Sequence, residues 1–98
     1  MYFVLLCFDG TDSEAPARRA AARPAHLESI KPLIESGTLI YGGALLDEEG
    51  NMNGSILVLD YPSEEALRTE FLAKDPYVTE DVWRTIEIRK HKPVDAFL

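Results

Sequence analysis

His26 is the residue of this sequence best suited to chemistry, because it follows Pro24 by two positions in a stretch of helical character. Proline is tolerated best at the start of a helix, so we predict that a helix opens at Pro24 with His26 in its first turn. Ile30 and Leu33 share its face, which turns the imidazole toward a sheet. Burial and a helix N-terminus both favour a neutral ring that can accept a proton. The alternative is a structural core histidine bonded to a backbone carbonyl.

Asp75 is the predicted partner of His26. It closes a second helical stretch, because the residue before a proline is pushed out of helical geometry and Pro76 follows. When two helices pack on one sheet face, the end of the second can lie near the start of the first. A carboxylate against an imidazole fixes its tautomer and supports general base catalysis. Asp75 can also cap the short turn that begins at Pro76, and the two roles are compatible.

Three arginines, Arg18, Arg19 and Arg23, form a basic patch in an otherwise acidic chain. A guanidinium beside a cavity can bind a carboxylate or a phenolate, and Arg23 is our candidate for that role. For Arg18 and Arg19 a solvated helix face is the expected role. Cys7, the single cysteine, lies in an apolar stretch and is predicted to be a core thiol rather than a nucleophile.

Glycines and a serine on two predicted neighbouring strands leave room for a ligand or for a partner backbone. These small residues are Gly42, Gly43, Gly54 and Ser55. The sequence contains no glycine-rich phosphate loop, no zinc-ligand pattern and no nucleophile elbow. We therefore expect no metal and no cofactor.

Six elements would position these side chains. We predict a strand over residues 2–8, a proline-interrupted helical stretch over 14–36, strands over 38–46 and 55–61 joined as a hairpin, a helix over 63–74 and a strand over 82–89. In the first helical stretch, the predicted buried stripe comprises Leu27, Ile30, Leu33 and Ile34. In the last strand, Val82, Ile86 and Ile88 would share one face and Trp83 would lie on the other.

This order predicts an α+β, ferredoxin-like βαββαβ fold, with a four-stranded antiparallel sheet and both helices on one face. The first strand is apolar on both faces, whereas helices can cover only one face of so small a sheet. We therefore predict a homodimer whose second subunit covers the other face and closes a partly wet cavity there.

Size and charge limit the remaining possibilities. The 98 residues leave room for one hydrophobic core, so residues 1–98 are predicted to form a single domain. The formal net charge of -7 would repel a phosphate backbone, which argues against nucleic acid binding. The longest apolar run is too short to cross a membrane, and no secretory signal is evident. One unpaired cysteine is consistent with a cytoplasmic protein.

Several separated motifs resemble the YciI-like (YCII-related) family, in the right order across nearly the whole chain. They are Arg23-Pro24-Ala25-His26-Leu27, Gly37-Thr38-Leu39, Gly42-Gly43, Gly54-Ser55, Ser63-Glu64-Glu65-Ala66 and Asp75-Pro76-Tyr77-Val78. The resemblance implies that His26 and Asp75 correspond to the proposed active-site pair of the family, and that the fold is a dimeric α+β barrel. We place Arg23, Gly43, Ser55 and Tyr77 around this pair as candidate substrate-binding residues.

Two functions are compatible with these features. The first is a cofactor-free isomerase or a lyase of the dehydrohalogenase type, in which His26 moves a proton on a small molecule that can carry negative charge. Acyl transfer fits less well, because no serine or cysteine is evidently paired with the histidine. The second is a binding or dimerisation module that uses the same cavity without catalysis.

Overall fold

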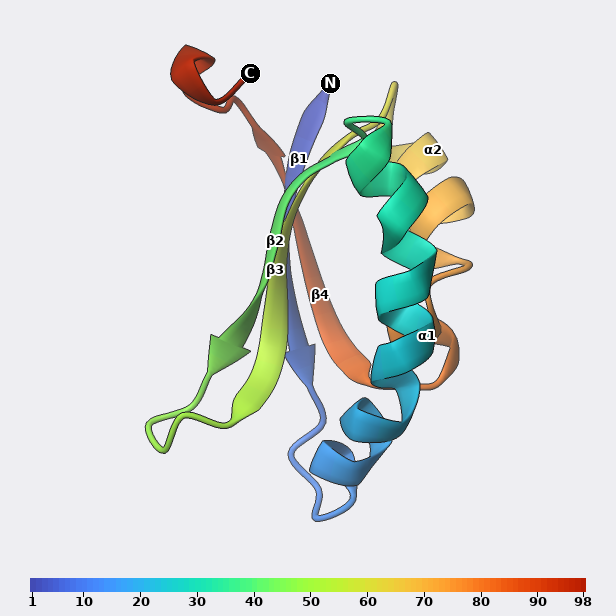
Figure 1. The fold of residues 1–98 in the computed structure, drawn as a ribbon, viewed down its shortest axis with the longest axis vertical. Helices are drawn as coiled ribbons and strands as arrows, with labels where there is room; N and C mark the ends of the chain where they lie inside the picture. The colour runs from blue at the N-terminus through green and yellow to red at the C-terminus, as the bar shows by residue number, and fades with distance from the viewer.

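Four antiparallel strands form one sheet in the order β2-β3-β1-β4 (Figure 1), in a computed structural model that describes residues 1–98. The strands are β1 (Tyr2–Asp9), β2 (Leu39–Leu46), β3 (Met52–Asp60) and β4 (Trp83–His91). Helix α1 (Ala15–Glu35) follows β1. A short helix α2 (Glu64–Ala66), a π-helical segment (Leu67–Leu72) and helix α3 (Pro76–Thr79) connect β3 to β4, and a 3-10 turn (Asp95–Phe97) follows β4. The predicted ferredoxin-like βαββαβ fold is confirmed.

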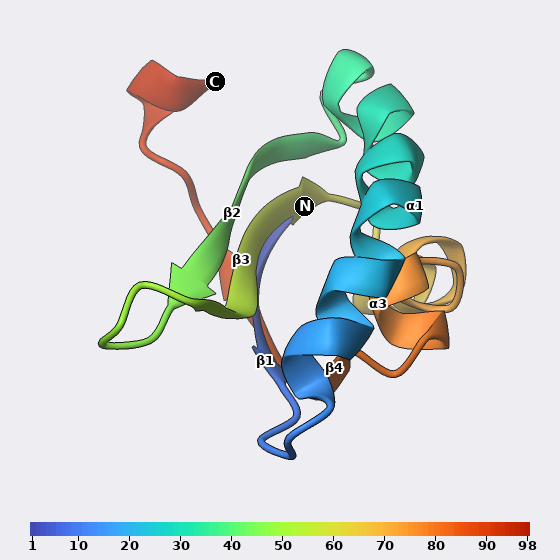
Figure 2. The ribbon, with the colours of Figure 1, turned by 60° about the horizontal axis from the view of Figure 1, so that its bottom comes forward.

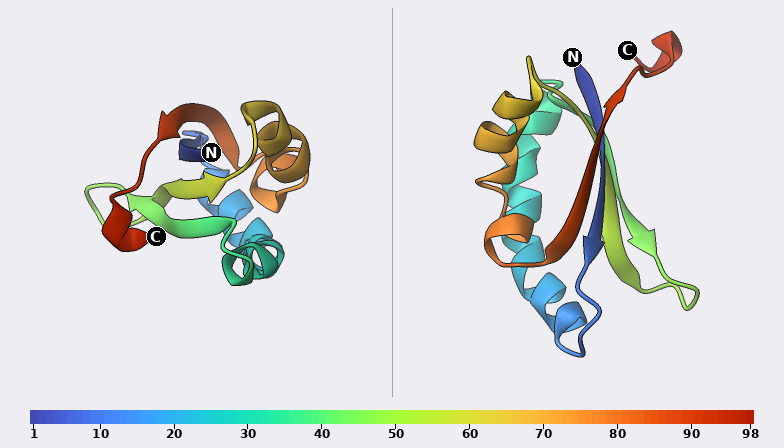
Figure 3. Two further views of the ribbon diagram at one scale, coloured as in Figure 1. Left: turned by 90° about the horizontal axis from the view of Figure 1, so that it is seen from above. Right: turned by 180° about the vertical axis from the view of Figure 1, so that it is seen from behind.

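All the helices between the strands pack on one face of the sheet, as the view from behind in Figure 3 shows. The sheet curves around α1, which lies on its concave side (Figure 2). The core fills the space between these two layers. Its sheet side includes Phe3, Leu5 and Leu59, and its helix side includes Leu67 and Phe71, all at most 3% exposed. The burial of these apolar side chains is the main force that holds the helices on the sheet.

Helix α1 runs without a break from Ala15 to Glu35, so the prediction of a helix that opens at Pro24 is wrong. Pro16 occupies the N-terminal turn instead, where a missing backbone donor costs little. Pro24 and Pro32 are both exposed, and their rings lie on the outer face of the helix. The carbonyl groups that lose a partner there can bond to water, and the helix accommodates the prolines by bending (Figure 1). His26 therefore lies in the middle of the helix.

The longer helix also shifts the buried stripe. The buried or partly buried residues lie at helical spacing along one face: Ala15, Arg19, Ala22, His26, Ile30 and Leu33. Two members of the predicted stripe, Leu27 and Ile34, are 39% and 55% exposed. Their prediction as buried residues is wrong, because both lie to one side of the true stripe, toward strand β2.

Trp83 points to the opposite face of the sheet from the one predicted, because β4 contains a bulge. Phe8 of β1 pairs with Thr85, but the next residue, Asp9, pairs with Trp83, so Arg84 is an extra residue in β4. One inserted residue reverses the alternation of side chains that follows it. Trp83 consequently lies on the helix-covered face, 4% exposed, and not on the open face that strict alternation predicts.

Polar side chains stabilise the hairpin turn and the ends of the short helices. Asp47 opens the hairpin turn and accepts hydrogen bonds from the backbone N–H groups of Glu49 and Asn51. Ser63 caps α2 through the backbone N–H of Ala66. Asp75 caps α3 through the backbone N–H of Tyr77, at 2.9 Å. This last cap fixes the position of a carboxylate at the N-terminus of α3.

The second face of the sheet carries no helix. It presents apolar side chains from β1 and β3 that include Val4, Leu6, Phe8 and Ile56, and Phe8 is 40% exposed. None of the helices combines the length and the apolar character that crossing a membrane requires.

The buried thiol of Cys7 predicts an alkaline loss of stability. Burial, reinforced by the negative charges of Asp75 and Asp9, raises the pKa of Cys7 to about 12, from 9.0 for a free thiol. Between these values the unfolded chain binds fewer protons, so the free energy of unfolding falls as pH rises. Urea unfolding of Cys7→Ala at pH 8 should show a loss of about 1 kcal/mol relative to the original protein. At pH 11, two pH units above the pKa of the free thiol, the linked loss in the original protein exceeds about 1 kcal/mol, so Cys7→Ala should become the more stable protein. A difference that stays constant with pH would contradict the assignment.

Candidate active site

His26 and Asp75 meet beneath the middle of α1. The Nδ1 atom of His26 lies 2.8 Å from Oδ2 and 3.1 Å from Oδ1 of Asp75, although the two residues are 49 positions apart. Asp75 is 3% exposed and His26 is 6% exposed. The carboxylate lies at the capped turn before Pro76, and the imidazole lies on the buried stripe of α1. The contact therefore depends on the packing of α1 against α3.

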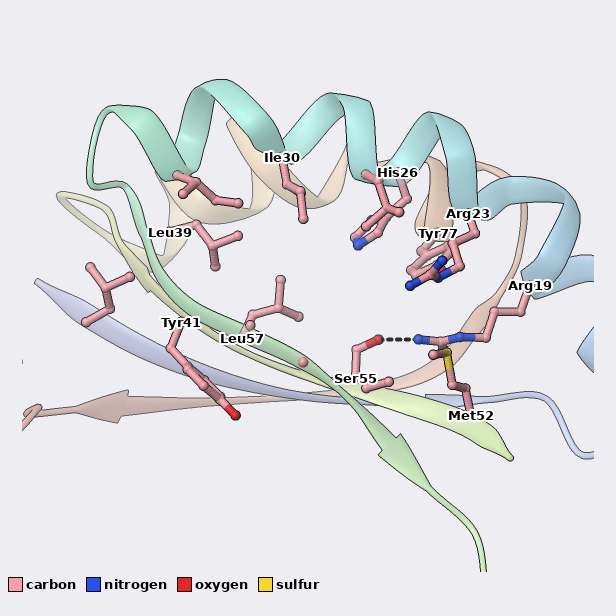
Figure 4. Close-up of a pocket in the computed structure, with 16 residues that line it drawn as sticks. Arg19, Arg23, His26, Ile30, Leu39, Tyr41, Met52, Ser55, Leu57 and Tyr77 are labelled. Carbon is pink, nitrogen blue, oxygen red and sulfur yellow. Dashed lines mark hydrogen bonds between the residues drawn. The ribbon is translucent and has the colours of Figure 1, made fainter. Parts of the chain in front are cut away.

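The hydrogen bonds of Asp75 fix the tautomer of the imidazole. A carboxylate only accepts, so Nδ1 of His26 carries the proton and donates a hydrogen bond to Asp75. The carboxylate also accepts from the backbone N–H of Tyr77 and, at 3.4 Å, from the hydroxyl of Ser29. No group of the chain bonds to Nε2 of His26, and Figure 4 shows a ring nitrogen that points into a pocket. In the neutral ring this nitrogen is a free proton acceptor.

Two aromatic rings hold the imidazole in place. The ring of Tyr77 stacks on it with centroids 3.9 Å apart and an angle of 10° between the planes. The ring of Trp83 meets it edge-on at 5.7 Å. Burial raises the pKa of the Tyr77 phenol, so this side chain stays neutral beside the imidazole. With three fixed neighbours, the direction of Nε2 is set by the fold before any ligand enters.

A second buried ion pair lies beside the first. Arg19 is 6% exposed, and its Nη1 atom lies 2.9 and 3.0 Å from the two carboxylate oxygens of Asp9. Its Nη2 atom donates to the hydroxyl of Ser55 at 3.0 Å, and its guanidinium lies 4.7 Å from the centre of the Tyr77 ring. The prediction that Arg19 lies on a solvated helix face is therefore wrong. Arg18, by contrast, is half-buried and pairs with the exposed Asp12.

A cavity of about 360 Å³ lies between α1 and the β2 edge of the sheet. Its charged and polar lining is Arg19, Arg23, His26, Ser55 and Tyr77, and its apolar lining includes Leu27, Ile30, Ile34, Leu39 and Leu57. The two groups separate along its length: in Figure 4, Ile30 and Leu39 lie at one end and Arg19, Arg23 and Ser55 at the other. The cavity can thus receive a molecule with one polar and one apolar end.

The location of this cavity corrects a prediction. We predicted it on the uncovered face of the sheet, whereas it lies under α1 on the covered face. The predicted site residues Arg23, His26, Gly43, Ser55 and Tyr77 all line it, and Asp75 lies behind the imidazole as a supporting group. Gly42 also lines the cavity. A Cβ atom added at Gly42 would have its nearest contacts at 3.8 Å, with the Leu39 side chain and the backbone of Ile56.

The charges around the cavity differ from those of the whole chain. Net charge is -7, yet no aspartate or glutamate lines the cavity, and the charged side chains that do are Arg19 and Arg23. Arg19 is paired with Asp9, whereas Arg23 forms no ion pair with any residue of the chain. Arg23 is therefore available to a ligand.

Sequence reasoning missed three members of this site: Asp9, Arg19 and Trp83. A signal for Arg19 was present, because it stands seven positions before His26 and so shares its helical face. The helix predicted to begin at Pro24 concealed that relation. Nothing in the sequence marks the bulge that turns Trp83 inward.

Comparison with known proteins finds relatives of this chain. The profile of the YCII-related domain matches residues 1–92. The chain is 28% identical to the protein YciI of Escherichia coli over 100 residues, which cover 96% of this chain and 99% of that protein. It is also 44% identical over 66 residues to the derivative of benzaldehyde biosynthesis cluster protein C of Emericella nidulans, a match that spans 60% of this chain and 66% of that protein.

Solved structures share the fold. The 5-chloro-2-hydroxyhydroquinone dehydrochlorinase TftG of Burkholderia phenoliruptrix, in complex with 2,5-dihydroxybenzoquinone, superposes with a TM-score of 0.80 at 22% identity and covers 98% of both chains. A dimeric ferredoxin-like protein of Jannaschia superposes with a TM-score of 0.51 at 15% identity, covering 94% of this chain and 98% of that one. The match over residues 1–92 shows that this chain belongs to the family of proteins with a YCII-related domain.

Proposed function

We propose that the protein is a cofactor-independent enzyme that moves a proton on a small molecule, with His26 as the base and Asp75 as the group that orients it. The observation that carries this proposal is the contact of 2.8 Å between Nδ1 of His26 and Asp75, which leaves Nε2 free toward the pocket. A general base must lie within hydrogen-bond reach of the proton that it removes, and a ligand in the pocket meets this condition.

The chemistry follows from the direction of the proton. Nε2 takes a proton from carbon or oxygen of the ligand, and the electron pair of the broken bond moves toward an adjacent electron-withdrawing group. Return of the proton at another atom completes an isomerisation, whereas departure of an anion completes an elimination. During either reaction the imidazole becomes positive, and the carboxylate of Asp75 stabilises it at the opposite nitrogen.

The lining of the pocket supports a ligand with a polar, acidic end and an apolar body. Arg23 has a free guanidinium that can bind a carboxylate through two parallel hydrogen bonds, or donate to the single oxygen of a phenolate. Ile30, Ile34 and Leu39 offer apolar surface to the remainder of the molecule. One protein of the same fold supports such chemistry, because TftG is named as a dehydrochlorinase of 5-chloro-2-hydroxyhydroquinone and was solved with 2,5-dihydroxybenzoquinone.

We also propose that the protein is a homodimer, with the two sheets facing each other as in an α+β barrel. The uncovered sheet face is apolar over β1 and β3, and Phe8 and Tyr41 are 40% and 61% exposed on it. The C-terminal residues Val94 and Phe97, 66% and 79% exposed, add apolar surface outside the core. The Jannaschia protein with this fold is described as dimeric, which supports the same arrangement here. We further propose that the protein is cytoplasmic, because Cys7, its single cysteine, is a free thiol.

Proton transfer can be tested before the substrate is known. In deuterium oxide, catalysed removal and return of a carbon-bound proton replaces it with deuterium, which proton NMR detects as a lost signal. With 2,5-dihydroxybenzoquinone and phenylpyruvate as probes, the protein should accelerate exchange of at least one. His26→Gln, which keeps a group able to bond to Asp75, should lower that rate by about 100-fold or more, the contribution of a general base. Equal rates for the two proteins would exclude His26 as the base.

A control for this experiment blocks the pocket without touching the catalytic pair. In Gly42→Val, the added Cβ would meet its nearest atoms at 3.8 Å, so the strand can accept it while the side chain narrows the pocket. We expect this variant to keep the thermal transition but to lose most of the exchange activity. Full activity in Gly42→Val would place the reaction outside this pocket.

The homodimer makes a separate prediction. Sedimentation equilibrium of the protein should give twice the chain mass of 11.0 kDa. Ile56→Lys puts a charge at the centre of the uncovered sheet face, where its cross-strand neighbours are Leu6 and Gly43. It should yield monomers, because burying an unpaired ammonium at an interface is strongly unfavourable. Ala21→Lys, on the exposed side of α1, is the matched control and should stay dimeric. A monomeric mass for the unaltered protein would refute the proposed assembly.

A further inference from the structure

Ser55 lies at the polar end of the pocket, with its hydroxyl between two fixed donors. It sits on β3, opposite Cys7 of β1, and is 4% exposed. Its Oγ accepts a hydrogen bond from Nη2 of Arg19 at 3.0 Å and another from Nε1 of Trp83 at 3.1 Å. Neither of these groups can accept a hydrogen bond, because a guanidinium and an indole N–H only donate. The direction of both bonds is therefore certain.

These two bonds determine what the hydroxyl of Ser55 can do. A hydroxyl group has two lone pairs and one proton, and the lone pairs are occupied by Arg19 and Trp83. The remaining proton has to be donated, yet no group of the chain accepts it. The carboxylate of Asp9 accepts from Nη1 of Arg19 and forms no hydrogen bond with Ser55. Because Ser55 lines the pocket, its proton is available to a molecule inside it.

We propose that Ser55 is a one-directional hydrogen-bond donor, which selects ligands that present a carbonyl, enolate or phenolate oxygen at the polar end of the pocket. This inference rests on the proposed function, since it describes the ligand on which His26 acts. His26 on α1 and Ser55 on β3 face each other across the pocket (Figure 4). A ligand that spans this gap meets a proton acceptor on one side and a proton donor on the other.

The arrangement suits a reaction in which an oxygen gains negative charge. When His26 removes a proton beside a carbonyl group, the electron pair moves to the carbonyl oxygen, and a donor already directed at that oxygen stabilises the charge. The hydrogen bond from the charged Arg19 polarises the Ser55 hydroxyl and strengthens its own donation. By the same geometry, a ligand with a pure donor at this position, such as an ammonium group, finds no free lone pair on Ser55 and leaves the Ser55 proton without a partner.

Two uncharged probes of nearly equal shape isolate this hydrogen bond. Acetophenone presents a carbonyl oxygen, whereas 2-phenylpropene has a methylene group in its place. Ligand-observed NMR titrations would give the ratio of their affinities for the original protein, Ser55→Ala and Ser55→Thr. We expect the original protein and Ser55→Thr to favour the ketone by about fivefold to tenfold, the effect of one hydrogen bond, and Ser55→Ala to bring the ratio close to one.

The ratio separates recognition from a merely structural role. If Ser55→Ala only loosened the packing of Arg19 and Trp83, both probes would weaken together and the ratio would stay unchanged, which would overturn the inference while leaving His26 as a base in the same pocket. Failure of both probes to compete with 2,5-dihydroxybenzoquinone, or to bind at all, would overturn the proposed pocket and with it the role of Ser55.

A gain of affinity offers an independent test. Trp83→Phe keeps an aromatic ring but removes the indole N–H, so one lone pair of Ser55 becomes free. The affinity for aniline relative to toluene should then rise by about fivefold over that of the original protein, because the hydroxyl can accept from the amine. An unchanged ratio would show that the two fixed donors do not control the direction of the Ser55 hydroxyl.

Discussion

The buried carboxylate of Asp75 is the interaction on which the site depends. It accepts from Nδ1 of His26 and from the backbone N–H of Tyr77, so one group orients the base, caps a helix and fixes the ring that stacks on that base. A buried carboxylate is unfavourable unless its oxygens are hydrogen-bonded, and here both are. The carboxylate thus couples the position of α3 to the direction of His26: the helices cannot shift without breaking the bonds that make its burial tolerable.

The ion pair of Arg19 with Asp9 likewise fixes the position of a polar group of the site, here on the side of the sheet. Its two bonds to the carboxylate hold the guanidinium 4.7 Å from the centre of the Tyr77 ring, and its third bond reaches Ser55. The bulge at Arg84 brings Trp83 onto this face, where its indole completes the environment of Ser55. Each of the two carboxylates therefore orients one polar group of the pocket. Asp75 orients His26, whose Nε2 points into the pocket, and Asp9 holds Arg19, which bonds to the Ser55 hydroxyl.

The sequence predicted the fold and the His26–Asp75 pair better than their surroundings. Alternating apolar strands, the cap at Ser63 and the proline after Asp75 are local signals. Such signals depend only on neighbouring residues, so tertiary packing does not change what they predict. The continuous α1 was missed because Pro24 is an unfavourable residue whose penalty depends on whether the freed carbonyl can reach water. That condition is tertiary, since it depends on which side of the helix faces the sheet. Trp83 was misplaced for a related reason, because a bulge is a relation between two strands and leaves no mark in either one.

The charge distribution limits how this pocket can bind an anion. At physiological ionic strength, charges farther apart than about 8 Å are largely screened, so the net charge of -7 acts mainly on approach and weakly on a bound ligand. Long-range attraction cannot bring an anion to such a surface. Attraction must arise at contact distance, where Arg23 is unpaired and no carboxylate lines the wall. The apolar end of the pocket then contributes the part of the affinity that does not depend on charge, which is why a ligand with a compact polar end and an apolar body matches both halves of the site.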